Sequence, residues 1–313
     1  MSDTFENVLV LSVGDAHELA PEVLNNPSER VLLKSIYKAV IENNDIFGDY
    51  ADYHNLAATY AKVDDYKSAY EIAVKGLNQY PFDIDLLADA VNYGSKCNKI
   101  QKCEEYIEVL LSRPFVFWNW RSFTFVIDYY MASLSWVEPE HIQAAFDMAI
   151  NMAKKYQETL PNEERGYVAE AEIHLKKADF VSAEEVLRKA IFGVESLIAP
   201  QCCLKYVDIL SEKGDYQNVI EVAKKGIAST AQDQPTARTG YFSYLSALAK
   251  DALLHQDQDF NNQDRVLNIY SDYKIADSLL VNTPAYIFNI HIRTHILSIK
   301  TGIPYDSESS ADK

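Results

Sequence analysis

The sequence predicts an all-α protein in which antiparallel helix pairs stack one after another. Three observations lead to this fold class. A pattern of aromatic, aliphatic and small residues recurs at helical spacing over most of the chain. The 313 residues include only 10 Gly and 10 Pro, which argues against an all-β or loop-rich protein. Apolar residues make up 48% of the chain, enough for a continuous core.

The clearest copy of the pattern lies within residues 53–81. Its members are Tyr53, Leu56, Ala57, Tyr60, Ala69, Ala73, Gly76 and Pro81. Residues three and four apart share one face of a helix, so the first four predict the buried face of a first helix. The small residues mark where a second helix packs closely against the first, and the proline ends that second helix.

This pattern resembles the tetratricopeptide repeat, whose 34-residue unit has the same residue classes at the same offsets. The resemblance covers roughly residues 50–280 and is strongest in the first and fifth units. It implies a right-handed superhelical solenoid of about six helix pairs, with the first helices lining the concave face. It also implies a scaffold that binds proteins or peptides.

The first three units differ in how well they keep the period. The first covers about 50–83 and the second about 84–116, where Cys103 follows Ala69 by 34 residues. The third is stretched, with an aromatic helix expected over Phe117–Leu134 and a partner helix over Glu140–Leu160.

The later units return to the pattern. In the fifth, the turn Gly214-Asp215-Tyr216 copies the turn Asp64-Asp65-Tyr66 of the first. The packing residues expected in these units are Tyr167, Ala171, His174, Ala183, Leu187 and Ala190 in the fourth, Tyr206, Val207, Leu210, Val219, Ala223 and Gly226 in the fifth, and Tyr241, Tyr244, Leu245, Leu248, Leu267, Ile269, Tyr273 and Ala276 in the degenerate sixth.

The two ends complete the expected domain organisation. Residues 1–48 read as an N-terminal helical cap, because a first repeat must cover its outer apolar face. The repeats then occupy 49–282, and a helix begun by Pro284 forms a C-terminal cap over 283–303. Residues 304–313 are polar and predict a disordered tail.

Charge and cysteine usage restrict the partners and the compartment. The chain has 29 Lys and Arg against 46 Asp and Glu, a formal charge of −17, which opposes binding of nucleic acid or an anionic membrane. The apolar run Val8–Leu11 is too short for a signal core or a membrane span. The four cysteines fall in no zinc spacing, and a reduced, cytoplasmic compartment fits them best.

No motif predicts catalysis, a metal or a cofactor. His291 and His295 lie four apart, as metal-binding pairs do, but the glutamate of the zinc-protease helix is absent between them and no third ligand is suggested nearby. Glycine-rich phosphate loops and the G-x-S-x-G nucleophile motif are also absent. We therefore expect a binding protein and no enzyme activity.

The aromatic run at residues 115–125 is the segment most indicative of binding. One helix cannot bury aromatics at consecutive positions on a single face. Trp120, Phe123 and Ile127 follow the core period, which leaves Trp118, Arg121 and Phe125 for a binding surface, since aromatic and Arg side chains dominate binding hot spots. The alternative is that the longer helices of the third unit bury the whole run.

Placing the period on the first helices predicts a partner-binding groove on the concave face. Its expected residues are His54, Asn92, Trp118, Arg121, Phe125, Glu172, Asp208 and Phe242. This mixture suits a protein or peptide with basic and apolar side chains, the carboxylates reading the basic part. The alternatives are binding through the convex face or the caps.

Two subtypes of the family can be compared with these residues. The clamp that holds a terminal carboxylate needs basic and Asn positions, and His54, Ala58 and Asn92 do not reproduce it. The peptide-sensing regulators carry a helix-turn-helix before their repeats, and the acidic first 48 residues hold no convincing one. An interaction adaptor is the leading interpretation. A peptide-gated regulator that acts by protein contact, or an accessory subunit of an enzyme, remains open.

Overall fold

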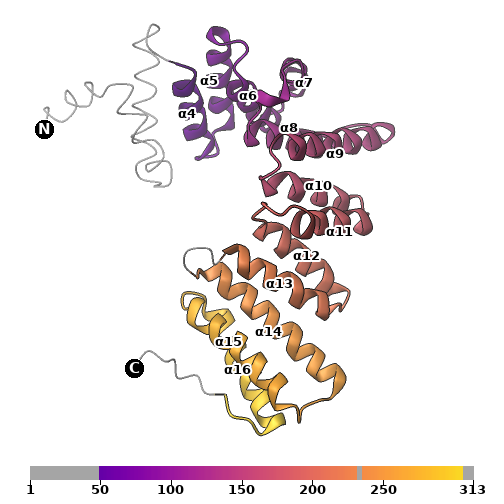
Figure 1. The fold of residues 1–313 in the computed structure, drawn as a ribbon. Helices are drawn as coiled ribbons and strands as arrows, with labels where there is room; N and C mark the ends of the chain where they lie inside the picture. Colours follow the sequence, from indigo (N-terminus) through magenta and orange to yellow (C-terminus); the bar gives the residue numbers. More distant parts are fainter. Residues whose placement is uncertain (1–48, 231–234, 306–313) are drawn as a thin grey trace, which may run out of the picture. The chain divides into compact units, whose positions relative to one another are not determined.

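The computed structural model describes residues 49–230 and 235–305 (Figure 1). These ranges hold thirteen α-helices and no strand, which confirms the predicted all-α fold of helix pairs. The expected N-terminal cap over 1–48 and most of the expected tail lie outside the described residues. The chain divides into two compact units, which meet in sequence between Leu160 and Pro161 and are described separately.

The first unit contains three helix pairs. Their helices are α4 (Tyr50–Ala61) with α5 (Tyr66–Gln79), α6 (Ile84–Lys96) with α7 (Ile100–Leu111), and α8 (Trp120–Ser133) with α9 (Ile142–Thr159). Short 3-10 turns, η2 (Phe115–Phe117) and η3 (Pro139–His141), precede the two helices of the third pair. Besides their own partners, α4, α6 and α8 contact one another in sequence order. First helices therefore lie side by side, as the repeat pattern predicts.

The second unit contains three further pairs and a last helix. These are α10 (Glu164–Lys176) with α11 (Phe180–Arg188), α12 (Pro200–Glu212) with α13 (Tyr216–Thr230), α14 (Ala237–Asp257) with α15 (Gln263–Leu279), and α16 (Pro284–Thr301). A π-helical turn, η4 (Lys189–Gly193), lengthens α11. The predicted last helix is present, and it ends at Gly302, whose φ of 71° is left-handed.

The turns inside four pairs share one local design. Each has a residue with left-handed φ followed by a polar residue that begins the second helix. The left-handed residues are Asp64, Asn98, Ala178 and Gly214. After three of them an aspartate oxygen accepts a hydrogen bond from a backbone N–H three residues later, as between Asp65 and Ser68 N at 3.1 Å. Such caps satisfy an otherwise unpaired helical N–H, so these short motifs fix where each second helix starts.

Small residues lie where the pattern predicts close helix packing. Ala69, Ala73 and Gly76 on α5 are buried. A Cβ atom at Gly76 would lie 2.9 Å from Cδ1 of Leu86 and 2.9 Å from the Cβ of Tyr53. Three helices therefore meet at this glycine, and a larger residue would force them apart.

The third pair begins later than predicted. Helix α8 starts at Trp120 and not at Phe117, because residues 115–117 form the η2 turn. The side chain of Asn119 then caps α8, accepting hydrogen bonds from Arg121 N at 3.0 Å and Ser122 N at 3.1 Å. Helix α9 likewise starts at Ile142 and not at Glu140.

Candidate functional site

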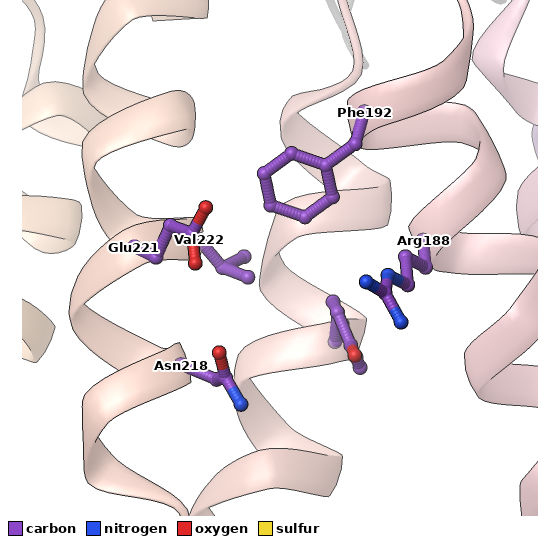
Figure 2. A pocket seen from close by; sticks show the side chains of 6 residues that line it. Arg188, Phe192, Asn218, Glu221 and Val222 are labelled. Carbon is purple, nitrogen blue, oxygen red and sulfur yellow. The ribbon is translucent and has the colours of Figure 1, made fainter.

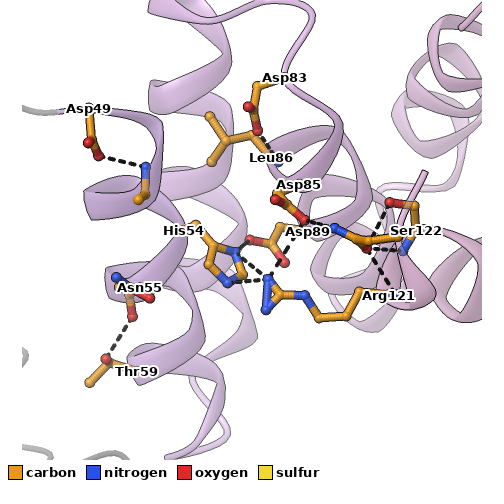
Figure 3. Close-up of polar contacts among 12 residues, drawn as sticks. Asp49, His54, Asn55, Thr59, Asp83, Asp85, Leu86, Asp89, Arg121 and Ser122 are labelled. Carbon is orange, nitrogen blue, oxygen red and sulfur yellow. Dashed lines mark hydrogen bonds and ion pairs between the residues drawn. The ribbon is translucent and has the colours of Figure 1, made fainter. Parts of the chain in front are cut away.

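Three first helices of the first unit bring five polar side chains together (Figure 3). We call this set the polar cluster: His54 on α4, Asp85 and Asp89 on α6, Asn119 at the N-cap of α8, and Arg121 in its first turn. The two aspartates are four residues apart, so they lie on one face of α6. Neighbouring first helices thus supply a shared polar surface.

Hydrogen bonds and ion pairs run across the polar cluster from α4 to α8. His54 Nδ1 contacts Asp89 Oδ2, and the Arg121 guanidinium contacts His54 Nε2. Asn119 Nδ2 donates to Asp85 Oδ1 at 2.6 Å, and Arg121 Nη2 lies 3.8 Å from the same oxygen. Because a guanidinium only donates, Nε2 must accept, which assigns the ring proton of His54 to Nδ1, where it donates to Asp89.

The polar cluster is closed at one side and open at the other. Asp89 is only 1% exposed, whereas Asp85 and Arg121 are partly open to solvent. The second oxygen of Asp89, Oδ1, is buried and has no hydrogen-bond partner among the described residues. Burial, and secondarily the charge of Asp89, raises the pKa of the neighbouring Tyr93 above its ordinary range. A buried carboxylate with spare acceptor capacity is costly, so an added donor at this site would be stabilising.

Four of the predicted groove residues lie on these first helices and are at least partly exposed: His54, Asn92, Arg121 and Phe125. The structure brings His54 and Arg121 into direct contact. Asn92 follows Asp89 by three residues on α6, and Phe125 follows Arg121 by four on α8. Both therefore continue the face on which the polar cluster lies.

Trp118 does not belong to an open groove, which corrects the prediction. It is 2% exposed, with its ring centroid 5.1 Å from that of Phe115 and 5.0 Å from that of Phe123. Trp120, expected in the core, is 40% exposed. The delayed start of α8 explains the exchange, because Trp118 precedes the helix and folds back onto Phe123, which stacks on Tyr156.

Phe242, on α14 of the second unit, is also a core residue and not a groove residue. It is fully buried, and its ring fills the space left by the missing side chain of Gly226 on α13. Glu172 and Asp208 are exposed on α10 and α12. Glu172 forms an ion pair with Lys205 Nζ at 2.5 Å, so a basic partner would have to displace that lysine. Desolvation of the carboxyl group raises the pKa of Asp208, and Lys205 opposes that shift.

The sequence interpretation missed Asp85, Asp89 and Asn119. A signal for Asn119 was available, because it caps α8 as Asp49 caps α4 and Asp83 caps α6. Asp89 looked like one of many surface carboxylates, and nothing local to it indicates burial.

Residues of α7, α8 and α9 and of the loop after α8 form an apolar groove of about 380 Å³. Tyr129, Trp136 and Met148 contribute to its lining, and Glu104 and Glu108 stand on its wall along α7. We call it the α7–α9 groove. It is a second concave surface of the same unit.

A smaller pocket of about 300 Å³ lies in the second unit (Figure 2). Arg188 and Phe192 line it from α11 and η4, Tyr206 from α12, and Asn218, Glu221 and Val222 from α13. None of the predicted groove residues lines this pocket.

The described residues offer little for covalent or metal chemistry. Within these ranges no three His, Cys, Asp or Glu side chains gather as metal ligands do. His291 Nε2 lies 3.5 Å from Asp277 Oδ1, so that histidine has a carboxylate neighbour. Burial raises the pKa of both Cys103 and Cys203 to about 12, which suppresses the thiolate needed for nucleophilic attack. No described helix combines the length and apolar character that crossing a bilayer requires.

Comparison with known proteins gives a fold and no sequence relative. No protein-family model matches the chain, and no curated protein matches it. Human IFIT1, solved as a dimer with m7Gppp-AAAA, matches with a TM-score of 0.52 at 12% identity, over 89% of this chain and 62% of its own. A tetratricopeptide repeat protein from Parabacteroides merdae matches with a TM-score of 0.47 at 13% identity, over 92% and 98%.

A third similar structure is TTC0263, a thermophilic TPR protein of Thermus thermophilus, with a TM-score of 0.44 at 14% identity, over 66% of this chain and 99% of its own. At such identities a likeness concerns the fold alone. The consecutive helix pairs, the small residues between them and the likeness to human IFIT1 agree: by fold, the chain is a tetratricopeptide-repeat-like helical protein.

Proposed function

We propose that this protein is a scaffold that binds a protein segment on the face formed by α4, α6 and α8. The polar cluster is the observation that carries the proposal. Side chains from three helices converge there, and one end of the set is open to solvent. Stacked helix pairs offer such faces to extended partners.

The charges of the polar cluster favour a segment with basic side chains. Two carboxylates, Asp85 and Asp89, face one guanidinium, Arg121, so the set is net negative when His54 is neutral. Asp85 is the carboxylate at the open end of the polar cluster. A lysine or arginine of the partner would pair with Asp85 there, and an apolar neighbour would meet Phe125, one turn further along α8.

The test compares partner capture by matched variants. Extracts of the cells that express the protein are passed over immobilised wild type and over Arg121→Ala, Phe125→Ala, Lys67→Ala and Met148→Ala. Lys67→Ala removes one cation from the second helix α5, and Met148→Ala shortens an apolar side chain in the α7–α9 groove. Captured proteins are identified by mass spectrometry, and the affinity of each is then measured.

We expect Arg121→Ala and Phe125→Ala each to weaken a captured partner by about 1 kcal/mol or more, as hot-spot residues do. Lys67→Ala and Met148→Ala should bind as wild type, and circular dichroism should show all four folded. Loss of binding in Met148→Ala alone would place the partner in the α7–α9 groove. Equal affinity in every variant would reject both the face formed by α4, α6 and α8 and the α7–α9 groove as the binding surface.

A further inference from the structure

The last helix, α16, exposes an apolar stripe along its whole length. Phe288 is 69% exposed and Ile299 is 71% exposed, and Ile292 and Ile296 between them are also exposed. The opposite face of α16 carries Ile290, Thr294 and Leu297, which are buried. The outward face of α16, the helix expected to cap the repeats, is therefore as apolar as its inward face.

The outward stripe has the spacing of a helix that packs against another helix. Phe288, Ile292, His295 and Ile299 follow one another at intervals of four, three and four residues. This alternation keeps a seam on one face of a helix and is the spacing by which helices pair along their length. We call these four residues the outer seam.

Charge distinguishes α16 from the rest of the protein. Among the described α-helices it is the one without Asp or Glu, in a chain whose formal charge is −17. Its two cations are engaged by neighbours: Arg293 Nη1 lies 3.3 Å from Asp251 Oδ2, and Lys300 Nζ lies 2.8 Å from His255 Nε2. Two copies of this acidic chain would repel each other over most of their surface, whereas the outer seam itself carries no carboxylate.

The outer seam is also self-complementary. When two α16 helices run antiparallel about a two-fold axis, Phe288 of each meets Ile299 of the other and Ile292 meets His295. The two residues of each pair lie at equal distances on either side of the midpoint of the seam, so the two-fold axis brings them together. A two-fold interface requires such reciprocal contacts. We propose that the protein forms a symmetric dimer through antiparallel pairing of the outer seam with a second copy.

The first test is the molar mass of the intact chain in solution. Sedimentation equilibrium between roughly 1 and 100 μM should show a monomer–dimer equilibrium, since association follows mass action. Phe288→Glu should raise the dissociation constant by at least about tenfold, because it places a charge in the buried seam. Val181→Glu is the matched control, an exposed apolar residue on α11 that receives the same charge, and it should leave the dissociation constant unchanged.

The second test reads the direction of pairing. Adding Ile299→Lys to Phe288→Glu places opposite charges in contact across an antiparallel pair and should restore most of the lost affinity. Adding Ile299→Glu instead places like charges there and should not. A wild type that stays monomeric at 100 μM would overturn the proposal, and so would a dimer that Phe288→Glu leaves intact. Equal effects of the two double variants would reject the antiparallel register.

Discussion

The contact between Gly226 and Phe242 shows how one residue position depends on another. Gly226 on α13 occupies a small position of the repeat pattern, and the ring of Phe242 on α14 lies against it. The pattern predicted the glycine correctly. It placed Phe242 in the groove, because helical spacing alone does not reveal which neighbouring helix has left room for an aromatic ring.

Gly226→Ala should therefore destabilise the protein, although alanine favours helix. Its Cβ would lie 2.4 Å from Cε1 of Phe242. Overpacking costs about 1–3 kcal/mol, against a gain of about 1 kcal/mol in helix propensity, so we expect a net loss and a lower thermal midpoint. Gly193→Ala is the control, because its Cβ would meet only Lys189 Cγ at 3.7 Å. An equal or higher midpoint for Gly226→Ala would show that α13 and α14 are not packed as described.

The polar cluster marks the limit of sequence reasoning at the residue scale. His54 and Arg121 were predicted on one face because the apolar pattern fixes the rotation of each first helix. Asp89 could not be predicted to bury, because its burial depends on the contact with His54, 35 residues away. The capping position of Asn119 was readable, since Asp49 and Asp83 precede the first helices of the two earlier pairs in the same way.

At the scale of the helix, the pairs were predictable where small residues recur and less so where aromatics crowd. The first, second, fourth and fifth pairs follow from the positions of their alanines and glycines. In the third pair, the start of α8 depends on the Asn119 cap, which competes with the apolar pattern around it. The cap therefore decided the start of the helix against the apolar pattern. As a result Trp118 is buried and Trp120 is exposed, the reverse of the prediction.

Ala69→Leu and Ala183→Leu should each destabilise by roughly 1–3 kcal/mol, because both alanines are fully buried and leucine would push neighbouring helices apart. Alanine and leucine are both good helix formers, so helix propensity contributes little. The matched control is Ala144→Leu on the exposed face of α9, which should melt like wild type. Thermal unfolding monitored by circular dichroism measures the change in stability of each variant. Unchanged melting of both buried variants would show that the assigned helix faces are wrong.

At the scale of the whole molecule, charge sets which partners can approach. The formal charge of −17 is spread over helices from both compact units, with α16 as the exception already described. The average field around the chain therefore repels polyanions and attracts basic proteins. Composition alone was enough for that prediction, whereas the polar cluster became visible only in the structure.

We accordingly expect the protein to bind RNA or duplex DNA no better than an unrelated acidic protein does. Binding of nucleic acid requires cations that replace the counterions of phosphate, and here 29 Lys and Arg are outnumbered by 46 Asp and Glu. Fluorescence anisotropy with labelled RNA and DNA at physiological salt measures this directly. A dissociation constant in the micromolar range or tighter would contradict it, and it would point to a basic strip that the average charge conceals.

The left-handed residue inside four of the pairs has a consequence for how such a chain can change over time. In each of these four pairs, a few adjacent residues form the turn between the two helices, such as Asp64 with Asp65 or Ala178 with Asp179. The bend of one pair therefore does not depend on the length of the next. A change in the length of one pair can therefore be accommodated without altering its neighbours, which leaves individual pairs free to diverge toward new partners.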